Sequence, residues 1–189
     1  YMPCQIQKVK EFVHALNIPM IELYGYEADD IIGTIANKAA KEDVITYMVT
    51  PDKDYMQLVT EKTFLYKPTK NMFGTRILEA DIIGIEGVKE KFGVEPAKVI
   101  EVLGLMGDAS DNIPGVKGVG EKTAIALIQE YGSIENLYAN IEKITKPKLK
   151  ENLITYKANA LLSKRLATID IETPINVDFH NLNRKSINE

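Results

Sequence analysis

Residues 1–70 alternate between two patterns of hydrophobic positions. In some segments apolar residues recur at helical spacing, and in others they form short β-branched runs that are typical of buried strands. The expected helices are Gln5–Leu16, Tyr26–Lys41 and Asp54–Val59, and the expected strands are Ile18–Leu23, Val44–Thr50 and Thr63–Lys67. This alternation predicts βαβ units with a mainly parallel sheet flanked by helices.

From residue 71 the pattern becomes almost entirely helical. Arg76–Asp81 is expected to be a short extended piece. Helices are expected over Ile83–Phe92, Pro96–Met106, Glu121–Glu130, Ile134–Ile141 and Lys148–Lys164. The predicted fold is therefore α/β followed by a helical subdomain, divided into an α/β core (1–70), a helical part (71–165), and an exit strand with a polar linker (166–189).

Composition indicates a globular protein rather than a membrane or secreted one. The chain has 189 residues, of which 45% are hydrophobic. No apolar run approaches the about 18 residues of a membrane span, and no secretory signal precedes the first helix. Cys4 has only His14 and His180 as possible partners, which argues against a disulfide or a Cys/His catalytic site. We therefore expect a cytoplasmic protein without membrane contact.

Charge is unevenly distributed along the chain. The net charge of −4 argues weakly against a nucleic-acid partner. Basic residues nevertheless predominate from Ile141 to Arg165, while carboxylates gather in short motifs elsewhere. This distribution predicts an acidic cleft beside a basic shoulder, although lysines on a solvated helix face are the commoner explanation of such a run.

The first acidic motif lies at the start of an expected helix. Glu27, Asp29 and Asp30 occupy its first turn, where the helix dipole favours each negative charge by about 0.3–1 kcal/mol. Glu27 and Asp30 are three residues apart and face the same way, so they repel each other unless a cation lies between them. Since this motif contains no Lys or Arg, a divalent metal is the expected cation.

Two more acidic pairs are expected near the same place. Asp52 and Asp54 directly follow an expected strand, and ligands of open α/β sheets bind beyond the carboxyl ends of strands. Lys53 is expected to point away, and a helix cap is the alternative role for either aspartate. Asp108 and Asp111 are expected to share one helical face near this crevice. Oxygen ligands alone suit Mg²⁺ or Mn²⁺ rather than Zn²⁺.

A glycine-rich turn follows the last acidic pair. Gly115, Gly118 and Gly120 allow turns with positive φ and close backbone approach, and the N–H groups that open the next helix suit a phosphate. Lys117 and Lys122 would add positive charge. The sequence thus predicts a helix, a tight turn and a second helix that together suit a phosphate, with an ordinary helix connection as the alternative.

Three motifs together resemble one family. They are Gly25-Tyr-Glu-Ala-Asp-Asp30, Thr50-Pro-Asp-Lys-Asp-Tyr-Met-Gln-Leu58, and the stretch from Gly107 to Ala124. Their order and spacing resemble the 5′-nuclease domain of bacterial DNA polymerase I, which is related to the flap endonucleases and has a PIN-like core followed by a helix-hairpin-helix. The resemblance runs from about Val9 to about Val177. That domain normally begins with a segment that this chain lacks, so the chain alone is expected to bind DNA weakly and cut it poorly or not at all.

The resemblance implies two divalent metals, Mg²⁺ or Mn²⁺, which hydrolyse phosphodiesters when they lie about 3.5–4 Å apart. It assigns one metal to Glu27, Asp29 and Asp30, and the other to the remaining acids: Asp52, Asp54, Asp108 and Asp111. The implied substrates are 5′ flaps, nicked duplexes and RNA primers in replication and repair. Polymerase domains of the same polypeptide, a place at the bacterial nucleoid, and a monovalent cation at the hairpin are also compatible with it.

Two other readings stay open. The chain could be a non-catalytic helix-hairpin-helix module that binds duplex DNA, with structural or vestigial acids. The coding sequence upstream of Tyr1 would discriminate, because a nuclease needs a strand ending in Asp and then a basic segment. A nuclease that acts on RNA is the third reading, but such hairpins contact DNA backbones without using a 2′-hydroxyl.

Overall fold

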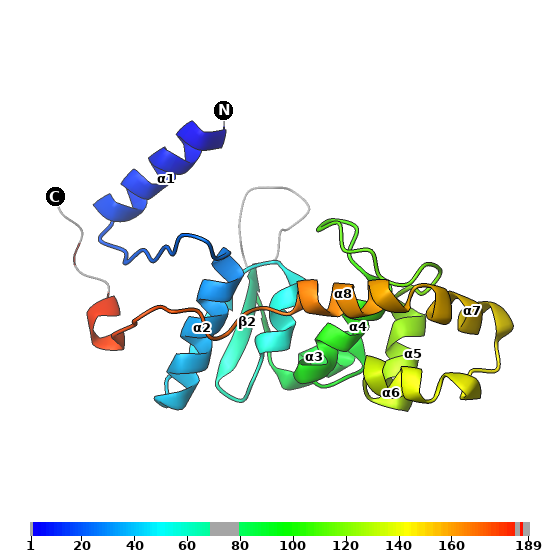
Figure 1. Cartoon of the computed structure of the whole chain (residues 1–189). Coiled ribbons are helices and arrows are strands. Elements are labelled where there is room, and N and C mark those ends of the chain that lie inside the picture. Colours follow the sequence, from blue (N-terminus) through cyan, green and yellow to red (C-terminus); the bar gives the residue numbers. More distant parts are fainter. Residues whose placement is uncertain (1, 69–79, 184–185, 187–189) are drawn as a thin grey trace.

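A computed structural model describes residues 2–68, 80–183 and 186. Figure 1 shows a small sheet and helix α2 toward one end of the molecule and a group of helices toward the other. The elements of the first part are α1 (Met2–Ala15), α2 (Ala28–Lys41), β1 (Thr46–Val49), the 3-10 helix η1 (Lys53–Leu58), β2 (Thr63–Pro68) and β3 (Ala80–Ile83). Among the described residues, no helix is long and apolar enough to cross a membrane.

The sheet confirms the α/β class but is mixed rather than mainly parallel. Its strand order is β1-β2-β3. Strands β1 and β2 are parallel, with Thr46 beside Thr63, whereas β2 and β3 are antiparallel, with Leu65 beside Ile83. The expected piece Arg76–Asp81 lies partly outside the described residues, and its described end belongs to β3. Helix α2 packs against β1 and η1, and the acidic motifs lie at this contact.

The strand predicted over Ile18–Leu23 is wrong. These residues have no regular structure, and Ile18 and Met20 are 41% and 47% exposed. A strand needs a neighbour for its backbone groups, and in the described sheet β1 pairs with β2 alone. An apolar run without a partner strand therefore remains a loop between α1 and α2.

The second part is helical, as predicted. Its helices are α3 (Ile85–Phe92), α4 (Val99–Met106), α5 (Glu121–Tyr131), α6 (Ile134–Ala139), α7 (Pro147–Thr155) and α8 (Lys157–Ala167). The single helix predicted over Lys148–Lys164 is wrong, because the chain bends at Tyr156 (φ −103°, ψ 20°) between α7 and α8. Leu153 and Ala160 are both fully buried and seven residues apart, so the apolar period continues across the bend and hides it.

Helix α4 forms the centre of the core. Val99, Val102 and Leu105 on it are fully buried, and α8 packs along it. Glu101 on the same helix is only 5% exposed. Its carboxylate accepts hydrogen bonds from the Lys164 Nζ (2.8 Å) and from the Ile134 backbone N–H (3.0 Å). Lys164 also pairs with Glu135, so this buried charge joins α4, α6 and α8.

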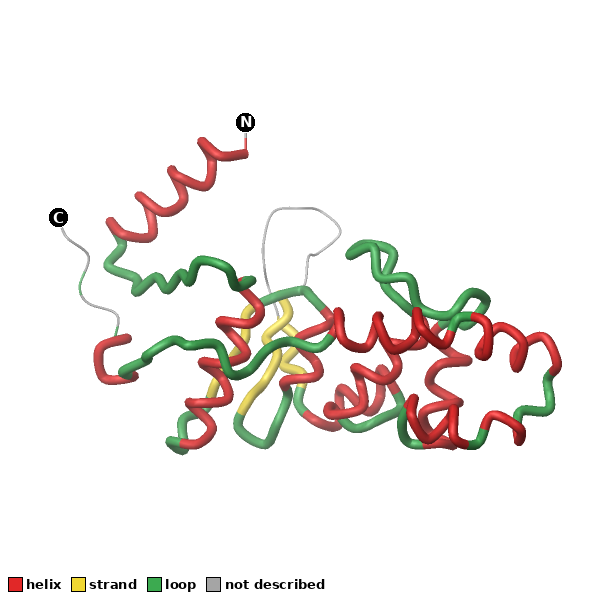
Figure 2. Tube along the Cα trace, in the orientation of Figure 1, coloured by secondary structure: helices red, strands yellow, loops and turns green. Residues whose placement is uncertain are grey.

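After α8 the chain returns across α2 as an exit segment, residues 167–175, rather than as the predicted exit strand (Figure 2). Side chains satisfy its backbone: the Gln57 Nε2 donates to the Ala167 carbonyl at 2.8 Å, and the Thr34 Oγ1 donates to the Asp170 carbonyl at 3.3 Å. Because side chains satisfy these backbone groups, the segment does not need the hydrogen bonds of a neighbouring β-strand. The boundary expected at residues 70/71 lies outside the described residues, and the three-part division remains a prediction.

Candidate functional site

The acidic motifs surround one cavity of about 600 Å³ between α2, η1, the turn after α4, and the exit segment. Its acidic lining consists of Glu27, Asp29, Asp30, Asp52, Asp54, Asp111 and Asp170. Arg165 is the only basic residue that lines it among the described residues. The predicted convergence of the motifs is therefore observed, with Asp108 just outside the lining.

The start of α2 fixes the first motif. Glu27 is the N-cap residue, and a reciprocal capping box links it to Asp30. The other Asp30 oxygen accepts the Asp170 backbone N–H at 2.8 Å. Asp29 accepts the Asp30 N–H at 2.9 Å. These bonds hold the first-turn acids beside the cavity, as predicted. They also give the acids a structural role in capping α2 and holding the exit segment.

In the second motif the two aspartates differ. Asp52 caps η1, because its Oδ1 accepts the Asp54 backbone N–H at 2.9 Å, so the alternative of a helix cap holds for this residue. The Asp54 side chain is only 14% exposed. Its Oδ1 is buried without any hydrogen-bond partner among the described residues. A buried carboxylate oxygen without a partner is costly, and a cation would offset that cost.

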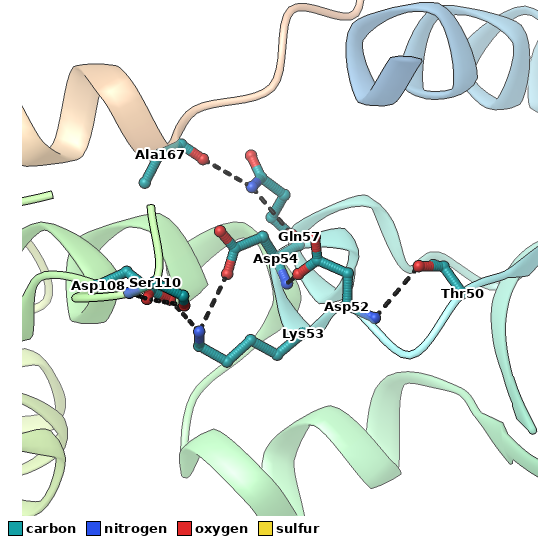
Figure 3. A network of polar contacts seen from close by, with 8 residues as sticks. All are labelled: Thr50, Asp52, Lys53, Asp54, Gln57, Asp108, Ser110 and Ala167. Atoms are coloured by element: carbon teal, nitrogen blue, oxygen red, sulfur yellow. Dashed lines mark hydrogen bonds and ion pairs between the residues drawn. The ribbon is translucent and has the colours of Figure 1, made fainter. Parts of the chain in front are cut away.

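Lys53 does not point away, so that prediction is wrong. Its Nζ is ion-paired with the Asp108 carboxylate and lies 3.8 Å from the Asp54 Oδ1, which is too far for a hydrogen bond (Figure 3). The long aliphatic stem of a lysine lets its ammonium reach acids on a neighbouring segment. Burial lowers the Lys53 pKa, but the bond to Asp108 and the nearby acids outweigh burial and raise it. The acids therefore have a cation supplied by the chain itself.

The third pair does not share a helical face. Helix α4 ends before it, and Asp108 and Ile113 form a small antiparallel bridge, with N···O distances of 3.0 and 2.7 Å. The turn between them places Asn112 at φ 59° and brings Asp111 back to the acids. Carboxylate oxygens of Asp54, Asp108 and Asp111 lie within 4.8 Å of one another. A turn thus achieves what the sequence attributed to a helix.

The protonation of the cluster is divided between its members. Burial, followed by repulsion from neighbouring acids, raises the pKa of Asp54 to about 6 against the opposing effect of Lys53. For Asp108 burial acts in the same upward direction, but hydrogen bonds from Lys53 and Ser110 outweigh it and lower the pKa to about 2. An ionised Asp108, an Asp54 oxygen without a hydrogen bond and the adjacent Asp111 form an oxygen-only donor set, which fits a hard divalent cation.

The predicted hairpin is present, but its three glycines have different structural roles. Gly115 (φ 58°) is buried, and its N–H donates to the Ser163 Oγ at 2.9 Å. Gly118 has φ 82°, whereas Gly120 is extended at φ −92° and needs no glycine conformation, contrary to expectation. Within the described chain, the backbone N–H groups of Lys117, Gly118 and Gly120 donate no hydrogen bond. These exposed donors are the part of the hairpin that can face a ligand.

Sequence reasoning missed the wall that the exit segment contributes. Arg165 and residues 166–170 line the cavity, although they are far along the chain from every acidic motif. Gln57 was missed as well: its side chain accepts the Ile169 N–H at 3.0 Å and donates to the Ala167 carbonyl. No local pattern distinguishes these residues, because their role depends on where α8 ends.

Two family profiles match the chain. The profile for the 5′-3′ exonuclease N-terminal resolvase-like domain matches residues 1–93, and that for the 5′-3′ exonuclease C-terminal SAM fold matches residues 94–189. DNA polymerase I of Caldicellulosiruptor bescii is 43% identical over 98% of this chain and 21% of its own length. DNA polymerase I of Bacillus subtilis is 44% identical over 97% of this chain and 20% of its own length. The chain thus spans about a fifth of these curated relatives.

Solved structures show the same fold. T5 5′-exonuclease with bound zinc has a TM-score of 0.69 at 24% identity, over 80% of this chain and 53% of that one. The catalytic core of Rad2 in complex with a DNA substrate has a TM-score of 0.59 at 21% identity, over 89% of this chain and 57% of that one. With the sequence matches covering both parts of the chain, this protein belongs to the 5′-3′ exonuclease family.

Proposed function

We propose that the protein of which this chain is part is a metal-dependent, structure-specific 5′-nuclease of the DNA polymerase I type. Its substrates would be 5′ flaps, nicked duplexes and RNA primers. The observation that carries the proposal is the cluster of Asp54, Asp108 and Asp111, in which a buried Asp54 oxygen lacks a hydrogen-bond partner among the described residues. Membership of an exonuclease family and the DNA and metal ions named for its structural relatives support it.

The acids would hold two Mg²⁺ or Mn²⁺ ions. We assign Glu27, Asp29 and Asp30 to one ion, and the set Asp52, Asp54, Asp108 and Asp111 to the other. Bound divalent ions would activate water and stabilise the leaving oxygen of the phosphodiester. Of the protein groups, Lys53 holds Asp108 ionised and oriented, and the capping bonds at the start of α2 fix the Asp30 carboxylate.

The hairpin would position the DNA. The free N–H groups of Lys117, Gly118 and Gly120 suit backbone phosphates, and Lys117 and Lys122 add charge beside them. Such contacts do not read bases, so affinity should ignore sequence and fall with salt. A monovalent cation at the hairpin and polymerase domains on the same polypeptide belong to the same proposal.

A non-catalytic duplex-binding module is the second candidate. One observation favours it: Asp52 and the Glu27–Asp30 box cap helices, so part of the acidic set has a structural use. The buried Asp54 Oδ1 weighs against it, because this oxygen makes no hydrogen bond among the described residues and so contributes to no cap. The two candidates differ in the effect of Mg²⁺: a nuclease needs it for DNA cleavage, whereas in a binding module it changes stability alone.

Cleavage of a 5′-flap duplex in Mg²⁺ tests the proposal, using this chain and a version extended upstream. We expect cleavage by the extended version and its loss in Asp54→Asn and Asp111→Asn. Asp81→Asn, an exposed acid on β3 away from the cavity, is the matched control and should cut normally. An extended protein that binds the duplex but never cuts it would leave the second candidate. Full activity of the unextended chain would refute the expectation that it is weak alone.

A further inference from the structure

A second cavity, of about 430 Å³, lies along α5 on the basic side of the helical part. One wall is α5, and the other is the loop that leads into α7. Its floor is apolar, with Leu127, Ile144 and Leu149, and the hydroxyls of Thr123 and Thr145 lie on its lining. The charged groups around it are Lys122, Lys143, Lys146 and Glu130.

The lysines of this region fall into two groups. Three of those outside the cavity pair with acids, namely Lys148 with Glu151, Lys150 with Glu142, and Lys164 with Glu101, while Lys157 lies over the Tyr138 ring. Lys122, Lys143 and Lys146 form no ion pair within the described chain, although all three are exposed at the cavity. The fold therefore pairs Lys148, Lys150 and Lys164 with acids and leaves the three lysines at this cavity without an ion pair in the described chain.

The acidic residue in the lining does not cancel that charge. Among the described lining residues, Glu130 is one carboxylate against three ammonium groups, so the net charge of the lining stays positive. The remaining groups are ammoniums and hydroxyls above an apolar floor. Phosphate oxygens pair with ammonium groups and hydroxyls, and the apolar atoms of a sugar can lie against the apolar floor. These features match the backbone of a nucleic acid better than a small free anion, which would leave the floor uncovered.

The cavity continues the hairpin. Lys122 belongs to both, since α5 begins directly after Gly120. The other wall adjoins the hairpin too, because a Cβ added at Gly118 would lie 2.9 Å from the Asn152 Nδ2 on α7. From Lys122 to Tyr131 the helix rises about 14 Å at about 1.5 Å per residue. One DNA strand has about one phosphate per 3.4 Å of axis, so this length corresponds to roughly four nucleotides.

We propose that the α5–α7 cavity is a second backbone-phosphate site, in which Lys143 and Lys146 hold a duplex strand a few nucleotides from the hairpin contact. The inference rests on the proposed function and specifies how far the DNA footprint extends. It makes Lys146 part of that footprint rather than a solvated residue beside it. It predicts a larger number of phosphate contacts than the hairpin alone provides.

The test is the salt dependence of binding to a blunt duplex of arbitrary sequence, without divalent metal. The variant is Lys143→Gln with Lys146→Gln, and the matched control is Lys148→Gln with Lys157→Gln, which removes the same charge outside the cavity. The slope of log K against log salt is about 0.9 per phosphate contact. We expect the cavity variant to lose nearly two from the slope and about tenfold in affinity at moderate salt, with an unchanged melting temperature.

Other outcomes are decisive as well. If the control loses as much slope and affinity as the cavity variant, only net charge matters and the site is refuted. If the wild type binds no duplex, both the inference and the proposed function fail. If Gly118→Val weakens duplex binding and the cavity variant does not, only the inference fails. Titration with inorganic phosphate supplies the last arm: tight saturation of the cavity by phosphate, with duplex binding unaffected by the variant, would make it a small-anion site instead.

Discussion

Two lysines of this protein pair with buried acids, and their surroundings differ. Lys164 joins Glu101 and Glu135 where three helices meet, and both Glu101 oxygens receive a hydrogen bond. Lys53 joins Asp108 beside the acidic cavity, where further carboxylates gather and the Asp54 Oδ1 has no hydrogen-bond partner among the described residues. The buried Glu101 carboxylate is matched by one lysine, whereas the carboxylates around Lys53 outnumber it.

The comparison separates charges that serve the fold from charges that await a ligand. A buried pair is worth little overall, but breaking it is expensive because one charge is left buried. A cluster with excess negative charge gains stability only when a cation arrives. The same residue types therefore give opposite responses to mutation and to metal, and four experiments can test this difference.

The largest effect is expected at the balanced junction. Lys164→Met leaves Glu101, which is 5% exposed, without its cation, and should lower the free energy of unfolding by about 3 kcal/mol. Urea denaturation measures it. Lys148→Met is the control, since its pair with Glu151 is solvent-exposed and should cost under about 0.5 kcal/mol. Equal losses in both variants would show that the junction is not special.

Metal should have the next largest effect, at the cavity alone. Mg²⁺ or Mn²⁺ at a hundred times its Kd should stabilise the fold by about 2.7 kcal/mol. Asp54→Asn and Asp111→Asn should diminish that gain, whereas Asp81→Asn should retain it. Thermal denaturation with and without metal gives the comparison. A gain that survives both cavity substitutions would place the metal elsewhere.

Removing Lys53, the lysine beside the acidic cavity, should tighten metal binding. Lys53→Met takes away the positive charge that competes for Asp54 and Asp108, so the affinity for Mn²⁺ should rise by about tenfold, or 1.4 kcal/mol. The metal-free protein should become less stable, because the acids then repel each other without a counter-ion. Isothermal titration calorimetry measures the first change. Weaker binding by the variant would mean that Lys53 organises the ligands more than it competes.

The smallest effect extends the comparison to uncharged donors. Ser163→Ala removes the acceptor of the Gly115 N–H and should cost about 1 kcal/mol of stability without changing duplex affinity at temperatures where the fold persists. Gly120→Ala should instead weaken duplex binding without changing stability. Gly120 is extended, and an added Cβ meets nothing within 4 Å, so stability is kept while close approach of a phosphate is hindered by about threefold in affinity. Filter binding and melting curves separate the two.

The sequence predicted most of the elements because their signals are local. The apolar spacing of α2 and the β-branched run before η1 are visible within one segment. The loop at Ile18–Leu23 and the bend at Tyr156 were missed because each depends on a neighbour: the first on a partner strand, the second on what α7 and α8 pack against. Periodicity reports burial and not the direction of the chain.

For the site, the sequence identified the acids but not their arrangement. A strand end and a helix start placed Asp52 and Asp30 correctly, since both positions are set by adjacent residues. The inward reach of Lys53 and the turn at Asn112 were not predicted, because a side-chain direction and a positive φ are decided by packing. The contribution of Arg165 needed the path of α8, which no motif encodes.

The exit segment also has a consequence for the order of folding. Its bonds join residues far apart in sequence, such as Asp170 to Asp30 and Thr173 to Thr34. Contacts of such long sequence separation form late, because loop closure must come first. Helix α4 can pack early against α5 and α6, which follow it closely in sequence, whereas the wall of the cavity is completed only when residues 167–173 reach α2. A chain emerging from the ribosome therefore acquires its acids long before it acquires its site.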